Sequence, residues 1–197
     1  MVPRVEPLST RPTKDVLTDA LLDITAQHGL EQVSVRQVAA AAGVSIGTVQ
    51  HHFPTKDAMV TAAFTEVVRR IRERVAGVAL GPDVHRNLTA VLRELLPLDE
   101  RRATEVRIQV AFAARAATTP SLATLQAGIL ADVGEAIAGA IARAGRGAVP
   151  PEEARALARI ALAAVDGLAL HAVSSGSWDR TALTDALDRL IDMLLAR

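Results

Sequence analysis

One short segment, residues 45–53, contains several side chains that can form hydrogen bonds. The candidate contact residues of this segment are Ser45, Gly47, Thr48, Gln50, His51 and His52. Hydroxyl, amide and imidazole groups bind phosphate oxygens and base edges in a nucleic acid, and a glycine lets the backbone approach closely. Either histidine alone is better explained as a solvated surface residue, so the prediction of nucleic-acid binding depends on the whole segment.

The pattern within this segment predicts a short helix with two different faces. Ser45 can cap the helix, which is expected to run through Phe53 until a proline breaks the chain. At about 100° per residue, Ile46, Val49 and Phe53 fall on one side. The polar groups fall on the other side, with Gln50 flanking the apolar stripe. The apolar side can anchor the helix while the polar side enters a major groove about 12 Å wide.

Two further helices are expected before this one. The first covers residues 13–27, where apolar side chains recur at helical spacing. Ser34 and Gln37 have the spacing of a capping box and open the second helix, which Gly43 ends in a left-handed conformation. The turn at 43–45 then joins the second helix to the third. A short turn that contains glycine is typical of a helix-turn-helix.

Residues 33–59, V-S-V-R-Q-V-A-A-A-A-G-V-S-I-G-T-V-Q-H-H-F-P-T-K-D-A-M, resemble the signature of the TetR family of bacterial transcriptional regulators. In that family a G-V-S-x-G-T-x-Y-x-H/Y-F segment is followed by a short loop and by Lys with Asp or Glu, as here at Lys56-Asp57. The resemblance implies that Lys56 contacts phosphate, and an ammonium at a helix N-terminus suits an anion. Gln50 departs from the family, which usually has an aromatic residue there. Glutamine can instead bind adenine through two hydrogen bonds.

The resemblance implies an all-α fold with an N-terminal three-helix DNA-binding head, a long linking helix and a C-terminal helical body for ligand binding and dimerisation. We therefore expect a flexible tail at 1–12, the head at 13–60 and the body at 61–197. Periodicity and loop residues predict helices at about 56–78, 83–96, 99–117, 120–145, 151–174 and 179–196. The segment A-V-D-G-L-A, residues 164–169, is similar to the branch of the family that includes the betaine-pathway repressors.

Net charge gives no indication of a nucleic-acid partner, because 22 basic and 22 acidic residues balance. Basic groups must therefore act through their placement. Ser34 and Arg36 are further candidates for phosphate contacts, although Arg36 fits a solvated first-turn residue equally well. The basic run at 69–74 is more simply explained as a solvated face or a set of pairing residues than as a second nucleic-acid surface.

Several classes of chemistry are not expected. The chain has no Cys, which excludes disulfides, thiolate metal sites and a cysteine nucleophile. No Ser/His/Asp set, metal-ligand spacing or phosphate-binding loop is recognisable, so we predict no catalytic residue, no metal, no cofactor and no enzymatic activity. Residues 1–12 contain three prolines and no apolar run, unlike a signal peptide or a membrane span. We expect a cytoplasmic protein with no membrane partner.

Within the apolar helices of the body, polar groups and one Phe are candidates for a ligand pocket, although for each polar group a position facing solvent is the more common explanation. The candidate residues are Arg107, Gln109, Phe112, Asp166 and His171. Asp166 and His171 are five residues apart and do not stack on one helix face, which argues against a catalytic pair. With one Trp, three Phe and no Tyr, an aromatic cage for a quaternary ammonium is not expected.

Apolar stripes in the last two expected helices have two explanations, core packing within one chain or a four-helix bundle with a second subunit. The candidate dimer contacts are Leu157, Val165, Leu168, Leu187, Leu190 and Leu194. The family resemblance favours the dimer. Two heads about 34 Å apart could then contact successive major grooves of a palindrome.

Together these features predict a ligand-responsive regulator, a repressor that binds double-stranded operator DNA as a homodimer and is released by a small apolar or amphipathic effector. The sequence does not fix the sign of the response, so activation stays open. A helical carrier or enzyme with an incidental helix-turn-helix is the alternative from another class. A non-specific architectural DNA binder is a further alternative, against which the neutral charge argues.

Overall fold

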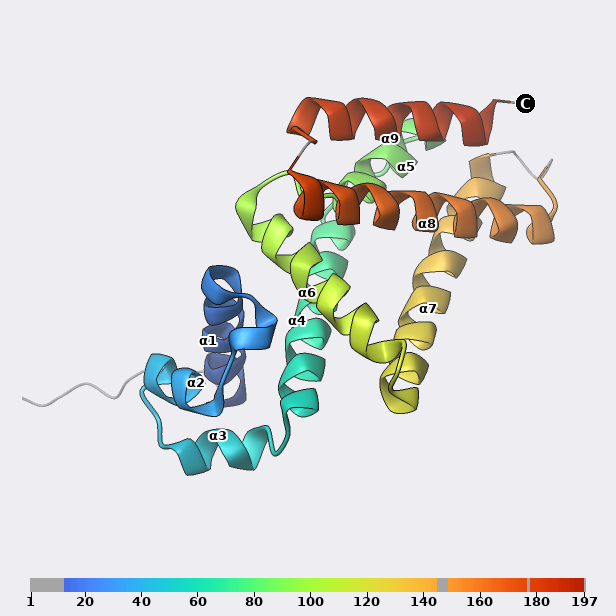
Figure 1. Ribbon diagram of the computed structural model, residues 1–197. Helices are drawn as coiled ribbons and strands as arrows, with labels where there is room; N and C mark the ends of the chain where they lie inside the picture. Colours follow the sequence, from blue (N-terminus) through green and yellow to red (C-terminus); the bar gives the residue numbers. More distant parts are fainter. Residues whose placement is uncertain (1–12, 145–148, 177, 197) are drawn as a thin grey trace, which may run out of the picture. The chain divides into compact units, whose positions relative to one another are not determined.

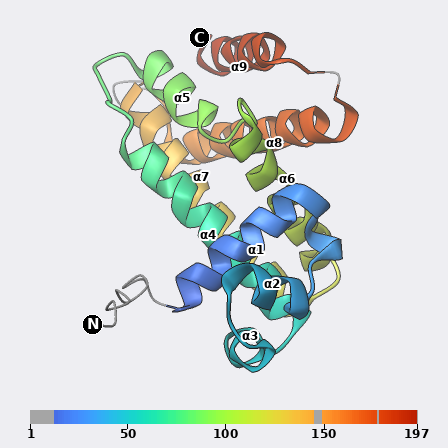
Figure 2. The same ribbon diagram turned by 90° about the vertical axis from the view of Figure 1, so that its left-hand side faces the viewer.

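The computed structural model describes residues 13–144, 149–176 and 178–196, so the tail predicted at 1–12 lies outside the described residues. The chain divides into two compact units, the first ending at Ala63 and the second beginning at Phe64. All regular structure within the described ranges is helical (Figures 1 and 2). The prediction of an all-α fold is therefore confirmed.

The first unit contains three α helices and the beginning of a fourth. The helices are α1 (Thr13–His28), α2 (Val35–Ala42), α3 (Ile46–His52) and the start of α4 (Lys56–Ala76), with a 3₁₀ turn, η1 (Leu30–Gln32), between the first two. The sequence did not predict η1. Gly29 precedes this turn with a positive φ of 78°, a conformation that glycine adopts without strain. Leu30 is buried at the start of the turn.

Side-chain caps determine where α2 and α3 begin. Ser34 Oγ accepts a hydrogen bond from the Gln37 N–H at 3.3 Å, and Gln37 Oε1 accepts one from the Ser34 N–H at 3.0 Å, so the predicted capping box is present. Ser45 Oγ accepts from the Thr48 N–H at 3.1 Å. Gly43, with φ 67°, ends α2 in the predicted left-handed conformation. The turn between α2 and α3 is thus defined at both ends.

Buried apolar side chains hold α3 in the first unit. Val49 has no exposed surface, and Phe53, which ends the helix, is 2% exposed. Val38 of α2 and Leu21 of α1 are likewise fully buried. Helix α2 contacts both α1 and α3. Because α3 has only seven residues, this packing rather than its intrinsic helix propensity stabilises it.

The second unit contains the rest of α4 and five further helices. These are α5 (Val84–Arg93), α6 (Glu100–Ala116), α7 (Pro120–Ala144), α8 (Pro151–Ser175) and α9 (Arg180–Leu195). Aspartates cap three of them, since Asp83, Asp99 and Asp179 each accept a hydrogen bond from the backbone N–H three residues later. The predicted helices therefore occur in the predicted order.

One hydrophobic core joins α5, α7, α8 and α9. Its fully or almost fully buried members include Leu92, Ile141, Val165, Leu187 and Ile191. Helix α7 packs along α8, and α9 contacts both α5 and α8, which lie beside it in Figure 1. Val106 extends this core to α6, which also contacts α7 and α8.

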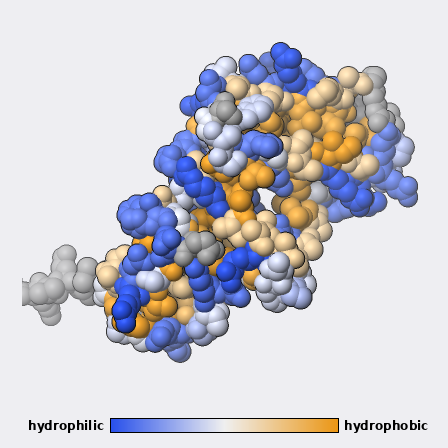
Figure 3. Space-filling model, viewed as in Figure 1, coloured by the Kyte–Doolittle hydropathy of each residue, from blue (hydrophilic) through white to orange (hydrophobic). Residues whose placement is uncertain are grey.

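By length and composition alone, α7 and α8 could each cross a membrane. Both contribute buried residues to the core, such as Ile137 in α7 and Ala158 in α8, and long core helices of a bundle meet the same criteria. Much of their remaining surface is exposed, including Leu130 and Ile160. On the face drawn in Figure 3, apolar side chains gather on the second unit between hydrophilic areas. The second unit thus has apolar surface that its own core does not cover.

Candidate nucleic-acid interface and ligand cavity

The face of α3 opposite its buried anchor carries the polar groups that the sequence placed there. Gly47, Gln50 and His51 are exposed, and Thr48 and His52 are half-buried. The His51 and His52 rings meet edge to face with centroids 5.3 Å apart. The helix therefore presents a band of small and hydrogen-bonding residues, as a helical wheel drawn at 100° per residue predicted.

Ile46 lies differently from the expectation. The wheel placed it with Val49 on the anchoring side, but 44% of Ile46 is exposed, so this expectation was wrong. Ile46 is the first residue of α3, and helical side chains lean towards the N-terminus. No earlier turn of α3 lies there to cover it. The exposed face of α3 therefore includes an apolar side chain at its N-terminal edge.

The serines singled out in the sequence both act as helix caps. Ser45 Oγ lies 2.9 Å from Thr48 Oγ1, and the Ser34 hydroxyl donates to Gln37 Oε1 at 2.8 Å. Both serines are exposed, so their hydroxyls can exchange these local bonds for a phosphate oxygen. The caps place them at the N-termini of α2 and α3, where backbone N–H groups also favour an anion.

Two basic residues lie in the first turns of helices. Arg36 is exposed in α2, and Lys56 is half-buried at the first position of α4. Thr55 Oγ1 accepts a hydrogen bond from the Ala58 N–H at 3.0 Å and so caps the start of α4. The 21-residue α4 carries a partial positive charge at this end, and the Lys56 ammonium adds to it.

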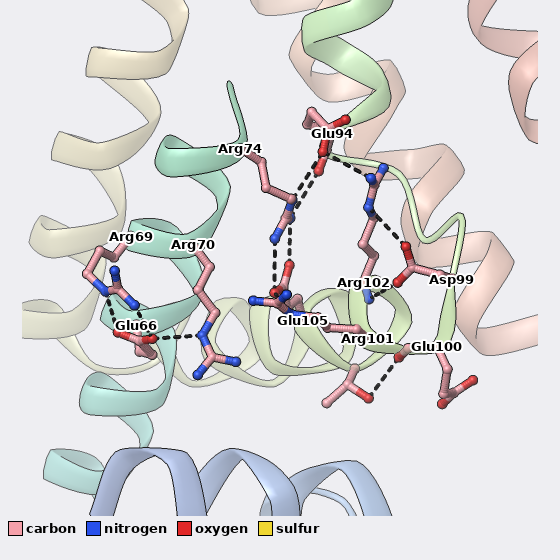
Figure 4. A network of polar contacts seen from close by, with 11 residues as sticks. Glu66, Arg69, Arg70, Arg74, Glu94, Asp99, Glu100, Arg101, Arg102 and Glu105 are labelled. Atoms are coloured by element: carbon pink, nitrogen blue, oxygen red, sulfur yellow. Dashed lines mark hydrogen bonds and ion pairs between the residues drawn. The ribbon is translucent and has the colours of Figure 1, made fainter. Parts of the chain in front are cut away.

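The basic run at 69–74 is neutralised by acidic partners of the second unit (Figure 4). Arg69 and Arg70 both bind Glu66 at 2.7 Å, and Arg69 also pairs with Glu73. Hydrogen bonds from Arg69 lower the pKa of Glu66 to about 2, opposed by burial and assisted by Arg70. This run therefore pairs with acidic side chains, one of the two explanations that the sequence favoured.

Arg74 joins three helices of the second unit (Figure 4). Its Nη2 donates to Glu105 Oε2 of α6 at 2.6 Å, and its Nε donates to Glu94 Oε2, just after α5, at 3.1 Å. Arg102 binds the same Glu94 carboxylate at 3.1 Å. Glu105 is one of the few buried charged side chains, with 5% of its side chain exposed. The network fixes the C-terminal part of α4 against α5 and α6.

A cavity of about 260 Å³ lies within the second unit, and we call it the body cavity. Helices α4, α6, α7 and α8 and Leu95 line it. Its walls are mainly aliphatic, with Val68, Ile71, Val106, Ile129 and Leu162 among them. Its polar lining groups are Arg72, Gln109, Gln126 and Asp166. An apolar space with a few polar groups is the usual form of a small-molecule site.

Two of the five predicted pocket residues line the body cavity, Gln109 and Asp166. Arg107 is exposed and binds Glu100 at 2.8 Å, while His171 is exposed outside the lining. Phe112 is fully buried and stacks on Phe64, with ring centroids 3.8 Å apart, so it supports a wall residue from behind.

Sequence reasoning missed Gln126 and Arg72. Gln126 is a polar residue in a largely apolar helix, the same signal that identified Gln109, so it could have been found. Arg72 belonged to a run interpreted as pairing residues, and it does pair, with Asp132 at 3.2 Å. Its contribution to the cavity depends on helix packing that the sequence pattern does not specify.

The predicted dimer contacts fall into two groups. Val165 and Leu187 are completely buried inside this chain, so they belong to its own core and cannot touch a second subunit. The remaining predicted contacts are partly buried against that core, and they are Leu157, Leu168, Leu190 and Leu194. More exposed apolar residues of the same helices are Ile160 of α8, 53% exposed, and Met193 of α9, 71% exposed.

The short turn between α2 and α3, the anchored α3 with its polar face and the capped start of α4 define a helix-turn-helix of the DNA-binding kind. A helical unit with its own core and a mainly apolar cavity follows it. This combination is that of a one-component transcriptional regulator.

Comparison with known proteins identifies the family. Residues 17–63 match the profile of bacterial regulatory proteins of the tetR family, and residues 84–196 match that of the C-terminal part of BetI-type transcriptional repressors. The chain therefore belongs to the TetR family, with a BetI-type C-terminal part. It is a transcriptional regulator and not an enzyme. Regulators of this family bind DNA and act as dimers.

Individual relatives agree with this assignment. The BetI regulator of Burkholderia thailandensis is 30% identical over 91% of this chain and 92% of its own. The chain matches only 49% of the length of the PksA regulator of Bacillus subtilis and 59% of the length of the BetI regulator of Stenotrophomonas maltophilia. A transcriptional regulator from Rhodococcus sp. Rha1 is 42% identical, with a TM-score of 0.84 over 94% of this chain and 97% of its own. A Saccharomonospora viridis regulator crystallised with choline is 19% identical, with a TM-score of 0.80 over 91% and 95%.

Proposed function

We propose that this chain is a repressor that binds a near-palindromic operator as a homodimer and is released by a small molecule bound in the body cavity. The observation that carries the proposal is α3, a helix anchored by fully buried Val49 whose opposite face is exposed and polar. We assign operator contacts to Ser34, Arg36, Ser45, Ile46, Gly47, Thr48, Gln50, His51, His52 and Lys56. The serines, Arg36 and Lys56 position the protein on phosphates, whereas Ile46 and Gln50 meet bases.

In this proposal residues 13–60 bind DNA, and residues 61–197 bind the effector and the second subunit. Ile160 and Met193, exposed on α8 and α9, provide apolar surface for a second copy of the chain. A homodimer is also what a palindromic operator requires, since two-fold symmetry places one α3 in each half-site. The protein would act in the cytoplasm, where its DNA is, without a membrane partner.

The body cavity supplies the response to an effector. Helix α4 begins at Lys56 in the first unit and lines the cavity with Ile71 and Arg72 in the second, so one helix is shared by the two functions. An effector changes DNA binding only if it binds the two states of the protein unequally, with a coupling of about 1–3 kcal/mol. The choline-bound regulator of similar fold supports a ligand-binding role for this unit.

The direct test is selection of genomic fragments bound by the purified protein, followed by gel shift on the enriched operator. Thr48→Ala and Lys56→Ala should each weaken binding about tenfold. Affinity should also fall with salt, because cationic residues such as Arg36 and Lys56 displace counterions from the DNA phosphates. Gln27→Ala, an exposed substitution at the end of α1, is the matched control and should bind normally. If neither substitution changes the affinity while the fold is intact, the assignment of α3 and the start of α4 is wrong.

Val49→Asp provides the complementary control. It places a carboxylate where the native side chain has no exposed surface, so it should unfold the first unit and abolish binding. Circular dichroism separates this loss from that of Thr48→Ala, which should retain the helical signal. An effector that strengthens the operator complex instead of releasing it would make the protein a co-repressor-dependent regulator or an activator.

A further inference from the structure

The body cavity contains one carboxylate with an unusual setting, that of Asp166 on α8. It is exposed to the cavity, and among the described residues no hydrogen bond or ion pair to it is found. Two acidic residues of the adjacent helix α7 are paired, by contrast, since Asp132 binds Arg72 at 3.2 Å and Glu135 binds Arg155 at 2.9 Å. A carboxylate only accepts hydrogen bonds, so a partner for Asp166 must be a donor.

The remaining walls of the cavity indicate which chemical groups the rest of such a ligand should carry. Aliphatic side chains from four helices form most of the wall, among them Val68, Val106, Ile129 and Leu162. Gln109 of α6 and Gln126 of α7 add amide groups that can donate or accept. With a volume of about 260 Å³, the space suits a small ligand with a short apolar body.

We propose that the effector of the body cavity is a small aliphatic amine whose ammonium N–H groups donate to Asp166. This inference rests on the proposed ligand-binding function of the cavity and specifies its ligand class. A primary or secondary amine is favoured over a quaternary ammonium, because the latter has no N–H to donate and is usually held by aromatic rings. Phe64 is the single aromatic residue among the lining residues described, and it is stacked on Phe112.

Electrostatics agree with a cationic head group. Burial among apolar walls raises the pKa of Asp166 to about 6, although the side chain is open to the cavity. The other charged groups lining this cavity and the adjoining groove between α7 and α8 are Arg72 from α4, Glu135 from α7, and Arg155 and Arg159 from α8. No charged residue of α6 lines either space. An amine would replace the hydration that Asp166 has lost, so its affinity should fall as the pH is lowered from 7.5 to 5 and Asp166 is protonated.

The test uses four probes of equal chain length, hexylamine, hexan-1-ol, hexanoate and hexyltrimethylammonium, titrated into the full-length protein without DNA by calorimetry or NMR. Hexylamine should bind at least tenfold more tightly than each of the other three. In Asp166→Asn this preference should disappear, with hexylamine losing at least tenfold and hexan-1-ol unchanged. Asp132→Asn, which removes the carboxylate paired with Arg72, is the matched control and should retain the preference.

Several results would overturn the inference. These are hexanoate or hexan-1-ol binding as tightly as hexylamine, hexyltrimethylammonium doing so, or Asp166→Asn keeping the full amine affinity. Absence of binding by every probe would overturn it as well.

Gel shifts distinguish a failure of this inference from a failure of the proposed function. Amine binding through Asp166 without any effect on the operator complex would contradict the regulatory proposal alone, whereas operator binding without amine binding would contradict only the ligand class.

Discussion

Ile46 is an exposed apolar side chain on α3, at a position that the family signature does not specify. It is 44% exposed at the first position of α3, next to the exposed Gly47. In a major groove the apolar feature of a base pair is the thymine methyl group, so we expect Ile46 to meet a thymine. Ile46→Ser should weaken operator binding about fivefold to tenfold, within the 1–3 kcal/mol of a good base contact.

Uracil substitution checks this prediction, because uracil lacks only the methyl group. In a gel-shift series each operator thymine is replaced in turn by uracil. At one position uracil should weaken operator binding by the wild-type protein and leave binding by Ile46→Ser unchanged. If every uracil-containing operator weakens the two proteins equally, Ile46 does not contact a thymine methyl.

Asp166 should make the stability of the protein depend on pH in an identifiable direction. Its pKa is about 6 in the folded protein, above the ordinary value of 3.8, so the folded state binds the proton more tightly than the unfolded state does. The ionised group therefore destabilises the fold above pH 6, and this cost disappears as the pH falls from 6 to about 4.

Asp166→Asn should accordingly be more stable than wild type at pH 7.5 and equal to it near pH 4. Because the side chain is partly open to solvent, we expect about 1 kcal/mol, a rise of a few degrees in Tm. Thermal unfolding of both proteins across this pH range measures the difference, and other titrating groups cancel in the comparison. A constant difference at all pH values would mean that packing and not ionisation is responsible.

At the scale of elements, the C-terminal part of α4 depends on Glu105. Arg74 donates two hydrogen bonds to this buried carboxylate, at 2.6 and 3.1 Å. Glu105→Gln keeps the shape but leaves Arg74 with less compensating charge, so we expect a loss of about 1–3 kcal/mol in the free energy of unfolding. Glu73→Gln removes an exposed partner of Arg69 on the same helix and should cost less than about 0.5 kcal/mol.

Urea denaturation of the two variants measures these losses. Equal losses would show that burial of the Arg74 pair adds nothing to stability. The comparison also bears on regulation, because in the proposed function α4 is shared by DNA binding and effector binding. A Glu105→Gln protein that folds but no longer responds to its effector would place the network in the coupling between them.

Helix positions were predictable because their signals are local. Ser34 with Gln37, the left-handed Gly43 and the aspartate caps act within one turn, and they define helix ends in any context. The interior of the body was less predictable. Val165 and Leu187 belong to apolar stripes that suit a dimer interface as well as a core, and only packing shows that both are fully buried. The expected burial of Ile46 was wrong because a helical wheel assumes that each residue has a helical turn on both sides, and the first residue of a helix has none before it.

At the scale of the whole molecule, the exposed apolar surface of α8 and α9 concerns assembly. Ala156, Ile160 and Ala163 are exposed at helical spacing on α8, and Met193 is exposed on α9. Small residues around one larger side chain allow helices to approach closely, and two copies would form a four-helix contact. We expect the interface to include Ile160 and Met193 and to exclude Val165 and Leu187.

Ile160→Glu should weaken self-association by at least tenfold, because each interface would contain two carboxylates related by the symmetry axis and deprived of water. Leu80→Glu is the matched control, since Leu80 is 63% exposed in the connection between α4 and α5. Sedimentation equilibrium measures the dimer affinity of both, and gel shifts with one and two half-sites show whether operator binding declines with it. If Ile160→Glu dimerises as well as Leu80→Glu, the dimer uses another face, and the spacing of its two α3 helices must be derived from that face.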